Sequence, residues 1–238
     1  MKACMMEHTT VKDIDGRLME TCVSQLQKSA LFSEIGEDDI QKIRKCIVRQ
    51  ERKVKKGDYI FRTGDEVRWV YLIVSGSMHI INEDFWGNLS LIETMEAGTV
   101  FGEAYVLAQE QYHLVSVVAA NDSLILEIDP SKMLAICKES CVCHTKLVKN
   151  ITYILSTKIV RLTGKVRHIT QRTTRQKLCS YLSRCARQEQ SNSFDIPYSR
   201  QQLADYLHVD RSALSHELSV MRDLKIVKYH KNHFELLS

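Results

Sequence analysis

Long apolar runs, proline and regularly spaced cysteine are scarce in this chain, and each shortage excludes a class of protein. No apolar stretch comes near the roughly 18 residues of a membrane helix. The first residues, MKACMMEHTTVKD, lack the continuous apolar segment of an export signal. Eight cysteines at irregular spacings favour free thiols over a disulfide framework. We therefore expect a cytoplasmic protein with no membrane partner.

Two prolines and an apolar share of 44% in 238 residues are typical of an ordered globular chain with one large or two modest domains. The net charge of +4 is unevenly placed. Residues from Thr170 to Ser238 hold 11 Lys and Arg against 7 Asp and Glu, whereas Met1 to Ile169 hold 22 of each sign. The excess positive charge therefore lies in the C-terminal part, where it suits contacts with nucleic-acid phosphates.

The middle of the chain, from Val54 to about Ile128, is rich in strand signals. Short apolar or alternating runs are separated by glycine-containing turns such as KKGD, RTGDE and VSGS. Many short strands at a spacing of roughly 8–12 residues predict a sandwich or barrel. The expected strands begin near Tyr59, Val70, Met78, Leu89, Leu114 and Leu124.

Helices are expected on both sides of these strands. Leu18, Cys22 and Leu26 lie at i, i+4 and i+8, which predicts helix between about Val11 and Val48. After the strands, a helix of about 25 residues repeats apolar residues in heptads, so it either joins two copies of the chain or packs on its own sandwich. Its stripe consists of Val148, Leu155, Leu162 and Ile169, with Ile151, Ile159 and Val166 alongside.

The C-terminal part contains the pattern that points to a partner. A helix is expected around Thr173 to Arg187, and Arg200 to Met221 reads as two short helices around a tight turn at His208. The final residues, IVKYHKNHFELLS, predict two short strands, a β-wing. The apolar faces of the paired helices are formed by Leu203, Ala204 and Leu207 in the first and by Leu214, Leu218 and Met221 in the second.

The second of the paired helices carries an outer face suited to base edges. Asp210 is expected as its N-cap. One Arg, one His and two hydroxyls near a helix N-terminus suit the major groove of DNA, where donors and acceptors are read. The alternative is a plain pair of helices with a solvated outer face. The outer residues are Arg211, Ser212, Ser215 and His216.

A small sandwich, a long heptad helix and a winged helix-turn-helix, in this order, resemble the CRP/FNR superfamily of bacterial transcription regulators. The resemblance runs from about Leu31 to Phe234 and includes the pattern KKGDYIFRTGDEVRWVYLIVSGSMHII. It implies an α+β fold, with an N-terminal double-stranded jelly-roll sandwich, a dimerisation helix and a C-terminal winged helix-turn-helix. The expected domains are residues 11–140, 141–169 and 170–238. Glycines are expected in turns where a Cβ would clash, at Gly57, Gly64 and Gly76.

The resemblance also implies a homodimer that binds a palindromic operator in double-stranded DNA, works with RNA polymerase and answers to a small effector. Ser212 and His216 stand where many members carry a Glu and an Arg, so we expect an operator unlike the family's best-known one. The implied DNA-binding residues are Ser199, Arg200 and Gln201 at the first helix and Arg211, Ser212, Ser215 and His216 at the second.

The implied effector site departs from the family pattern. Cyclic nucleotides need a Glu for the ribose and an Arg-Ser pair for the phosphate. Glu103 is present, either as a ligand or as a turn cap, but His113 and Leu114 replace the pair. A lone histidine is only partly charged near neutral pH, so we expect an effector other than cAMP or cGMP. The candidate effector residues are Gly102, Glu103, His113, Leu114 and Thr163.

Cys137, Cys141 and His144 share one helical face, with Cys143 beside them. They are candidates for zinc or haem ligands or a thiol sensor, or they are small side chains packed in a core. No metal or cofactor is assigned on this basis.

No paired HxH, HExxH, phosphate-cradling glycine loop or Ser/His/Asp arrangement is visible, so no enzymatic activity is expected. One further reading stays open, a cyclic-nucleotide-binding-like module that acts through protein partners without specific DNA binding.

Arg211 is the side chain from which the largest contribution to DNA binding is expected. Replacing it with alanine removes a charged donor for bases or phosphates, so the affinity for the operator should fall at least about tenfold. A gel-shift titration measures this change. An unchanged affinity would remove Arg211 from the interface.

Overall fold

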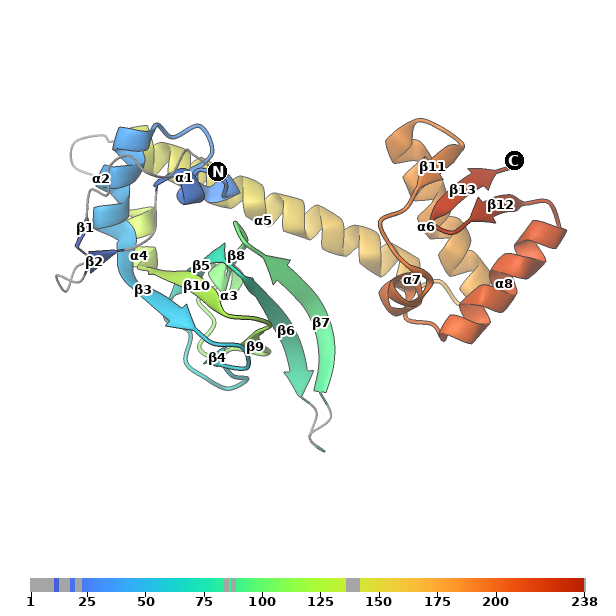
Figure 1. Cartoon of the computed structure of the whole chain (residues 1–238), viewed down its shortest axis with the longest axis horizontal. Helices are drawn as coiled ribbons and strands as arrows, with labels where there is room; N and C mark the ends of the chain where they lie inside the picture. The colour runs from blue at the N-terminus through green and yellow to red at the C-terminus, as the bar shows by residue number, and fades with distance from the viewer. Residues whose placement is uncertain are drawn as a thin grey trace. The chain divides into compact units, whose positions relative to one another are not determined.

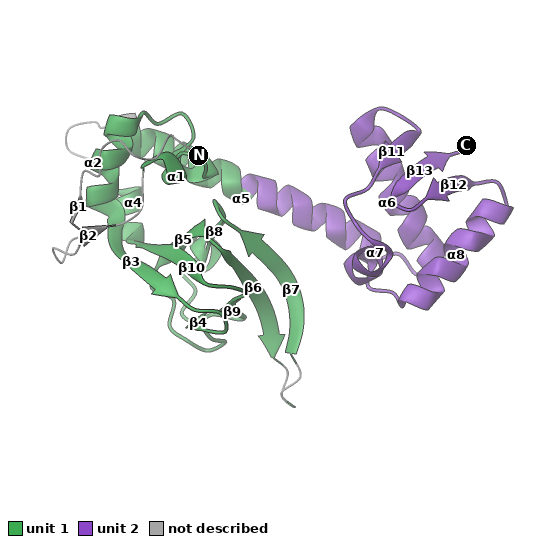
Figure 2. Cartoon of the chain, in the orientation of Figure 1, with its two compact units in different colours: residues 1–155 green, residues 156–238 purple. Residues whose placement is uncertain are grey.

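The computed structural model describes residues 11–12, 18–19, 23–83, 86, 89–135 and 142–237 (Figure 1). The chain divides into two compact units, residues 1–155 and 156–238 (Figure 2). One long helix, α5 (Val142–Ile169), contributes residues to both of them.

The first unit is built around two antiparallel four-stranded sheets, as the sequence predicts. One sheet has the strand order β3 (Val48–Val54), β10 (Ser123–Ile128), β5 (Val70–Ser75), β8 (Val100–Phe101). The other has the order β4 (Tyr59–Phe61), β9 (Ser116–Ala119), β6 (Ser77–Glu83), β7 (Leu89–Glu96). Alternation along the strands sends Ile73 and Ile125 into one shared core with Met78 and Val117 of the second sheet. The predicted sandwich is confirmed.

Helices cover the outer face of the first sheet. These are α1 (Val23–Leu26), a 3-10 helix (Ala30–Phe32), α2 (Glu37–Ile47), α4 (Pro130–Leu134) and the start of α5. Leu72, Leu126 and Ile128 of the sheet pack into one core with Leu147 and Ile151 of α5. The first turns of α5 therefore pack on the sandwich of their own chain, one of the two roles foreseen for this helix.

The predicted helix between Val11 and Val48 is confirmed in its later part, where α1, the 3-10 helix and α2 lie, and is wrong in its first part. Val11–Lys12 (β1) and Leu18–Met19 (β2) form a short antiparallel pair, so the helical spacing of Leu18 and Leu26 is coincidental. Helix α2 begins only after Gly36, with three acidic residues in its first turn, and stops where the β-branched Val48 becomes extended.

Strands β3 and β8 were not predicted from the sequence. Strand β3 reads VRQERKV, with no alternation of apolar and polar residues, because its charged side chains pair across the sheet. Strand β8 has only two residues, too few for any pattern.

The turn glycines are needed for their backbone conformation more than for space. Gly57, Gly64 and Gly76 have φ of +89°, +89° and +85°, a region that other residues rarely adopt. A Cβ at Gly57 or Gly64 would meet open space, so the predicted clash is wrong there. At Gly76 the same Cβ would overlap Ser123 Oγ and lie 2.7 Å from Asn121 Oδ1.

The second unit is a winged helix-turn-helix. It contains α6 (Thr174–Glu189), α7 (Arg200–Leu207), α8 (Arg211–Asp223) and the strands β11 (Ser193–Asp195), β12 (Val227–His230) and β13 (His233–Leu236). The predicted apolar faces of α7 and α8 are all buried in one core with Leu178, Leu182 and Phe234. Strand β11, which pairs with β13 as a third strand of the wing, was missed.

The C-terminal half of α5 is joined to this second unit. His168 Nδ1 lies 2.8 Å from Ser180 Oγ of α6, and its ring meets Tyr181 edge-on at 5.8 Å. The Arg184 guanidinium lies against Gly164, where any Cβ would overlap it. A Cβ at this position would require only the flexible end of Arg184 to move.

Gly76→Ala should destabilise the first unit more than Gly57→Ala. Both changes force an L residue into a left-handed backbone, which costs about 1–2 kcal/mol. Only the change at Gly76 also displaces Ser123, so its total loss should exceed about 2 kcal/mol. Urea unfolding of the two variants compares the losses directly. Equal losses would show that the Ser123 contact adds nothing.

Candidate nucleic-acid interface and effector site

The N-terminus of α7 is held by a capping box. Ser199 Oγ accepts from the backbone N–H of Gln202 at 3.3 Å, and Gln202 Oε1 accepts from the backbone N–H of Ser199 at 2.8 Å. Ser199 remains exposed. Gln201, also exposed, donates to Asp205 Oδ1 at 2.8 Å. Two of the predicted DNA-backbone residues therefore lie on the surface and also stabilise α7.

The turn between α7 and α8 is closed by a non-glycine residue. His208 has φ 51° and ψ 60°, the left-handed conformation that the sequence analysis considered for it. Asp210 follows as the N-cap of α8, as predicted, but its side chain makes no capping hydrogen bond. The reversal depends on backbone geometry and on contacts from α6.

The outer face of α8 is exposed where the sequence predicts it. Arg211, Ser212, Ser215 and His216 are all exposed, while the opposite face is fully buried. Arg211 is the first residue of the helix, so its side chain stands beside free backbone N–H groups. This face therefore offers exposed donors to a partner.

A basic hollow of about 660 Å³ lies beside the start of both helices. Its lining combines α7, α8 and the turn of the wing, which the sequence analysis did not connect. The lining residues are Asp195, Ser199, Arg200, Arg211, His230, Lys231, Asn232 and His233. Three Arg or Lys side chains against one Asp make the hollow suitable for an anion such as a phosphate.

Arg200 is placed differently from the other predicted contacts. Its guanidinium lies 4.8 Å from the ring centre of Tyr229 and 5.0 Å from that of Phe234. Burial lowers the pKa of this group. Arg200 therefore joins α7 to the wing by cation–π contacts and also lines the hollow.

The folded chain does bring a Ser, a His and an Asp together, which was not expected from the sequence. His233 lies with Nε2 3.0 Å from Ser193 Oγ and Nδ1 3.1 Å from Asp195 Oδ1. All three residues are exposed, and they join β11 to β13. Sequence spacing could not reveal this contact because about 40 residues separate the strands.

The predicted effector residues of the first unit surround the start of α3 (Glu103–Leu107). Gly102 has φ 79°, and a Cβ there would lie 3.1 Å from Trp69 O and from Tyr71 Cδ2. Glu103 is buried, with 2% of its surface exposed. Gly102 thus has a structural reason to be glycine.

His113 lies in an aromatic environment rather than an ionic one. It is buried, with its ring stacked on Phe61 at 3.6 Å and edge-on to Tyr105 at 5.0 Å. Burial lowers the pKa of His113, with a smaller opposing effect from Asp65, so the ring is neutral at pH 7. Leu114 beside it is 67% exposed. These residues do not form the cationic clamp that a cyclic phosphate needs.

Thr163, the remaining candidate, is exposed on α5 within the second unit. The other four candidates belong to the first unit. The predicted group of five therefore does not form one cluster within either unit.

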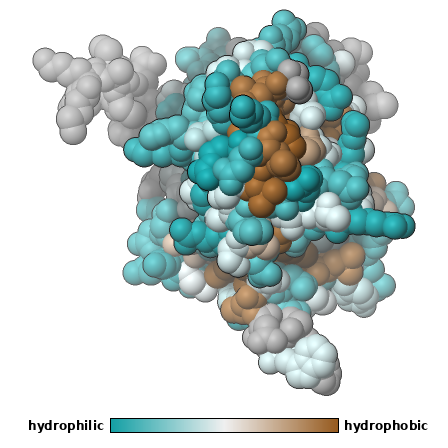
Figure 3. Space-filling view, turned by 90° about the vertical axis from the view of Figure 1, so that its right-hand side faces the viewer, coloured by the Kyte–Doolittle hydropathy of each residue, from teal (hydrophilic) through white to brown (hydrophobic). Residues whose placement is uncertain are grey.

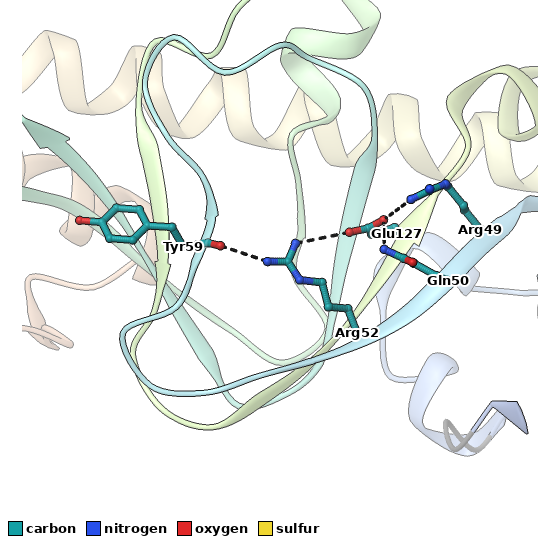
Figure 4. Close-up of polar contacts among 5 residues, drawn as sticks. All are labelled: Arg49, Gln50, Arg52, Tyr59 and Glu127. Atoms are coloured by element: carbon teal, nitrogen blue, oxygen red, sulfur yellow. Dashed lines mark hydrogen bonds and ion pairs between the residues drawn. The ribbon is translucent and has the colours of Figure 1, made fainter. Parts of the chain in front are cut away.

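A second hollow, of about 360 Å³, was not foreseen and lies at the rim of the sandwich. Glu127 Oε2 accepts from Arg49 Nη1 at 2.9 Å and from Gln50 Nε2 at 2.6 Å (Figure 4). Arg52 reaches Glu127 Oε1 at 3.5 Å and the carbonyl of Tyr59 at 3.1 Å. The buried carboxylate of Glu127 is thus paired with side chains of β3, the strand that was not predicted from the sequence.

The wall of this second hollow includes Tyr71, whose pKa is raised to about 12 by burial and by the charge of Glu127. The lining holds three Arg and three acidic residues, which balance in charge. They are Arg49, Arg52, Arg68, Asp65, Glu66 and Glu127.

The cysteine group stays a prediction. Cys137 and Cys141 lie outside the described residues, while Cys143 and His144 are both buried. Among the residues that the structure describes, no group of three His, Cys, Asp or Glu side chains has the geometry of a metal site. Nor does any described helix combine the length and apolarity that crossing a membrane requires.

Family comparisons agree with both units. Residues 51–140 match the cyclic nucleotide-binding domain, and residues 176–238 match the Crp-like helix-turn-helix domain. The two matched segments together span more than half of the chain. The chain belongs to the CRP/FNR superfamily of transcription regulators.

One solved structure supports this fold, and two further relatives are similar to parts of the chain or most of it. The c-di-GMP responsive global regulator CLP of Xanthomonas campestris is 17% identical, with a TM-score of 0.54 over 84% of this chain and 98% of its own. The catabolite activator protein of Thermus thermophilus is 20% identical, with a TM-score of 0.49 over 87% and 93%. Human cGMP-dependent protein kinase 2 is 27% identical over 44% of this chain but only 14% of its own length. The present chain thus spans about a seventh of that curated relative.

The neutral state of His113 predicts an acid-sensitive first unit. Its pKa is lower in the folded than in the unfolded chain, so only the unfolded chain takes up the proton just below pH 6.5. The free energy of unfolding should fall as the pH drops below about 6.5 and should not depend on this group above it. His113→Phe should reduce this dependence of the free energy of unfolding on pH, which urea unfolding of the first unit at several pH values measures. His79→Gln, a change on β6, serves as the control. The same pH dependence in the His113 variant as in the wild-type protein would contradict the assignment.

Proposed function

We propose that this chain is a homodimeric DNA-binding transcription regulator that reads a palindromic operator and answers to a small effector other than cAMP or cGMP. The observation that carries the proposal is the exposed donor face of α8 beside the basic hollow. An α-helix with such a face fits the major groove, and a cationic hollow next to it fits a backbone phosphate.

The dimer is supported by the outer surface of α5. Ile159, Leu162 and Val166 are 62%, 57% and 52% exposed, although apolar residues at this spacing usually form a seam. Exposed apolar stripes of this kind mark an interface with another surface. A second copy of the same helix supplies a matching stripe, and two-fold pairing gives the symmetry of a palindromic operator.

The choice of effector follows from the site in the sandwich. A buried neutral His113 and an apolar Leu114 offer a cyclic phosphate neither charge nor a hydroxyl donor. The effector is therefore proposed to be a molecule without a cyclic phosphate, and its identity is open. RNA polymerase is proposed as the protein partner, with the cytoplasm as the place of action.

The alternative, a sensor module that acts only through proteins, has less support. A helix face that only contacts water does not need an Arg, a His and two hydroxyls beside a basic hollow. DNA recognition uses all of them. If the chain binds no DNA, the module that acts through protein partners becomes the better account.

An unbiased selection of bound DNA, run with and without a metabolite extract, tests the proposal. The expected product is a palindrome whose half-sites are about 10–10.5 base pairs apart, or a multiple of this. Failure to enrich any sequence under either condition would favour the alternative.

Leu162→Glu should convert the dimer to monomers and weaken operator binding by more than about tenfold, because a charge is placed in the apolar seam. Sedimentation and fluorescence anisotropy measure the two effects. Thr157→Glu is the matched control, since Thr157 is exposed on the same helix outside the apolar stripe. A dimer that survives Leu162→Glu would place the interface elsewhere.

A further inference from the structure

Two cations in the first turns of α6 contact the helix-turn-helix, and neither belongs to the outer face of α8. Lys177 reaches the end of α7, and Arg175 reaches α8. Both contacts lie within the second unit, beside the core that α6 shares with these helices.

Lys177 closes the turn between α7 and α8. Its ammonium donates to the carbonyl of Leu207 at 3.0 Å and to the carbonyl of His208 at 3.1 Å. The last carbonyls of a helix have no partner within the helix and carry its partial negative charge, so a lysine stabilises them. His208 is the residue forced into the left-handed conformation. One side chain therefore ties down both sides of the reversal.

Arg175 provides the second connection. Its Nε donates to Glu217 Oε1 in the middle of α8, on a helix that begins three residues after the turn. The Glu217 side chain is 19% exposed and that of Arg175 43%, so the pair is partly shielded from water. Helix α6 thus contacts the end of α7 and the middle of α8 at once.

We propose that Lys177, assisted by Arg175, is a positioning residue that fixes the angle between α7 and α8 and thereby determines how well the protein discriminates its operator from other DNA. This inference rests on the proposed DNA-binding function. Base contacts depend on the placement of α8 to within fractions of an ångström, whereas phosphate contacts tolerate more displacement.

The contacts of Lys177 separate this role from direct DNA binding. Two of its three N–H groups are already used by carbonyls. A lysine that neutralised a phosphate would change the salt dependence of binding by about 0.9 in log–log slope when removed. A positioning lysine leaves that slope unchanged and alters only the ratio of specific to non-specific affinity.

The experiment uses the full-length chain with Lys177→Met, Lys177→Arg and the control Lys225→Met. Lys225 is an exposed lysine just beyond the far end of α8, so the control removes the same charge at a distance from Arg211. Anisotropy titrations against the selected operator and a scrambled duplex, at several salt concentrations, give the affinity ratio and the slope. Circular dichroism at the assay temperature confirms that each variant is folded.

For Lys177→Met we expect about a tenfold loss of operator affinity, less than a twofold change on scrambled DNA and an unchanged salt slope. Lys177→Arg, which keeps a donor, should recover most of the ratio, and Lys225→Met should keep it. A smaller salt slope with equal losses of affinity on both duplexes would make Lys177 a phosphate contact and overturn the proposal. An unchanged ratio of operator affinity to scrambled-DNA affinity would overturn it too. If wild-type protein shows no preference for any DNA, the proposed function itself fails, which is a distinct result.

Discussion

A helix-turn-helix can present its second helix to a groove only if the chain reverses within about three residues. Here a histidine makes that reversal in a conformation that glycine adopts more readily, with φ of 51° at His208. The cost is offset by the apolar faces that the two helices bury together and by a lysine from α6 that satisfies the carbonyls at the turn. The exposed face of α8, the basic hollow and the attachment of the wing through Arg200 all follow from this arrangement.

The sandwich has an aromatic interior around His113 and its charged side chains paired elsewhere. His113, where the resemblance implies a cationic clamp, lies between two aromatic rings, and burial lowers its pKa. Charge is concentrated at the rim, where Glu127 is balanced by arginines. This distribution of charge is the physical reason why the proposed effector is one that does not depend on a strong anion contact in the interior.

Patterns that depend on burial were the ones that the sequence predicted well. The two periodicities placed most strands and helices α5 to α8, because one face of each is apolar. Strand β3 was not predicted because the residues between its two buried valines are polar or charged, and β11 was not predicted because three residues are too few for a period. At the N-terminus the spacing of Leu18 and Leu26 predicted one helix, but only Leu26 is helical, whereas Leu18 lies in β2.

The candidate sites divide in the same way. The exposed face of α8 follows directly from the apolar face opposite, so it was predictable. The joining of the wing turn with Arg211, and of Lys177 with His208, depends on packing between segments far apart in the chain. On the C-terminal face shown in Figure 3, hydrophilic residues surround a limited hydrophobic patch, a mixture that sequence order alone does not reveal.

The contacts of Arg184 with Gly164 and of Ser180 with His168 make the last turns of α5 part of the DNA-binding unit. The stripe at Ile159, Leu162 and Val166 therefore belongs to the same compact unit as α8. In a dimer joined along this stripe, the geometry of the two paired α5 helices would set the distance between the two α8 helices. If the seam moved by one residue on both helices, each α8 would rotate about the axis of α5 by about 100°, so the position of the apolar repeat sets the direction in which the two α8 helices face.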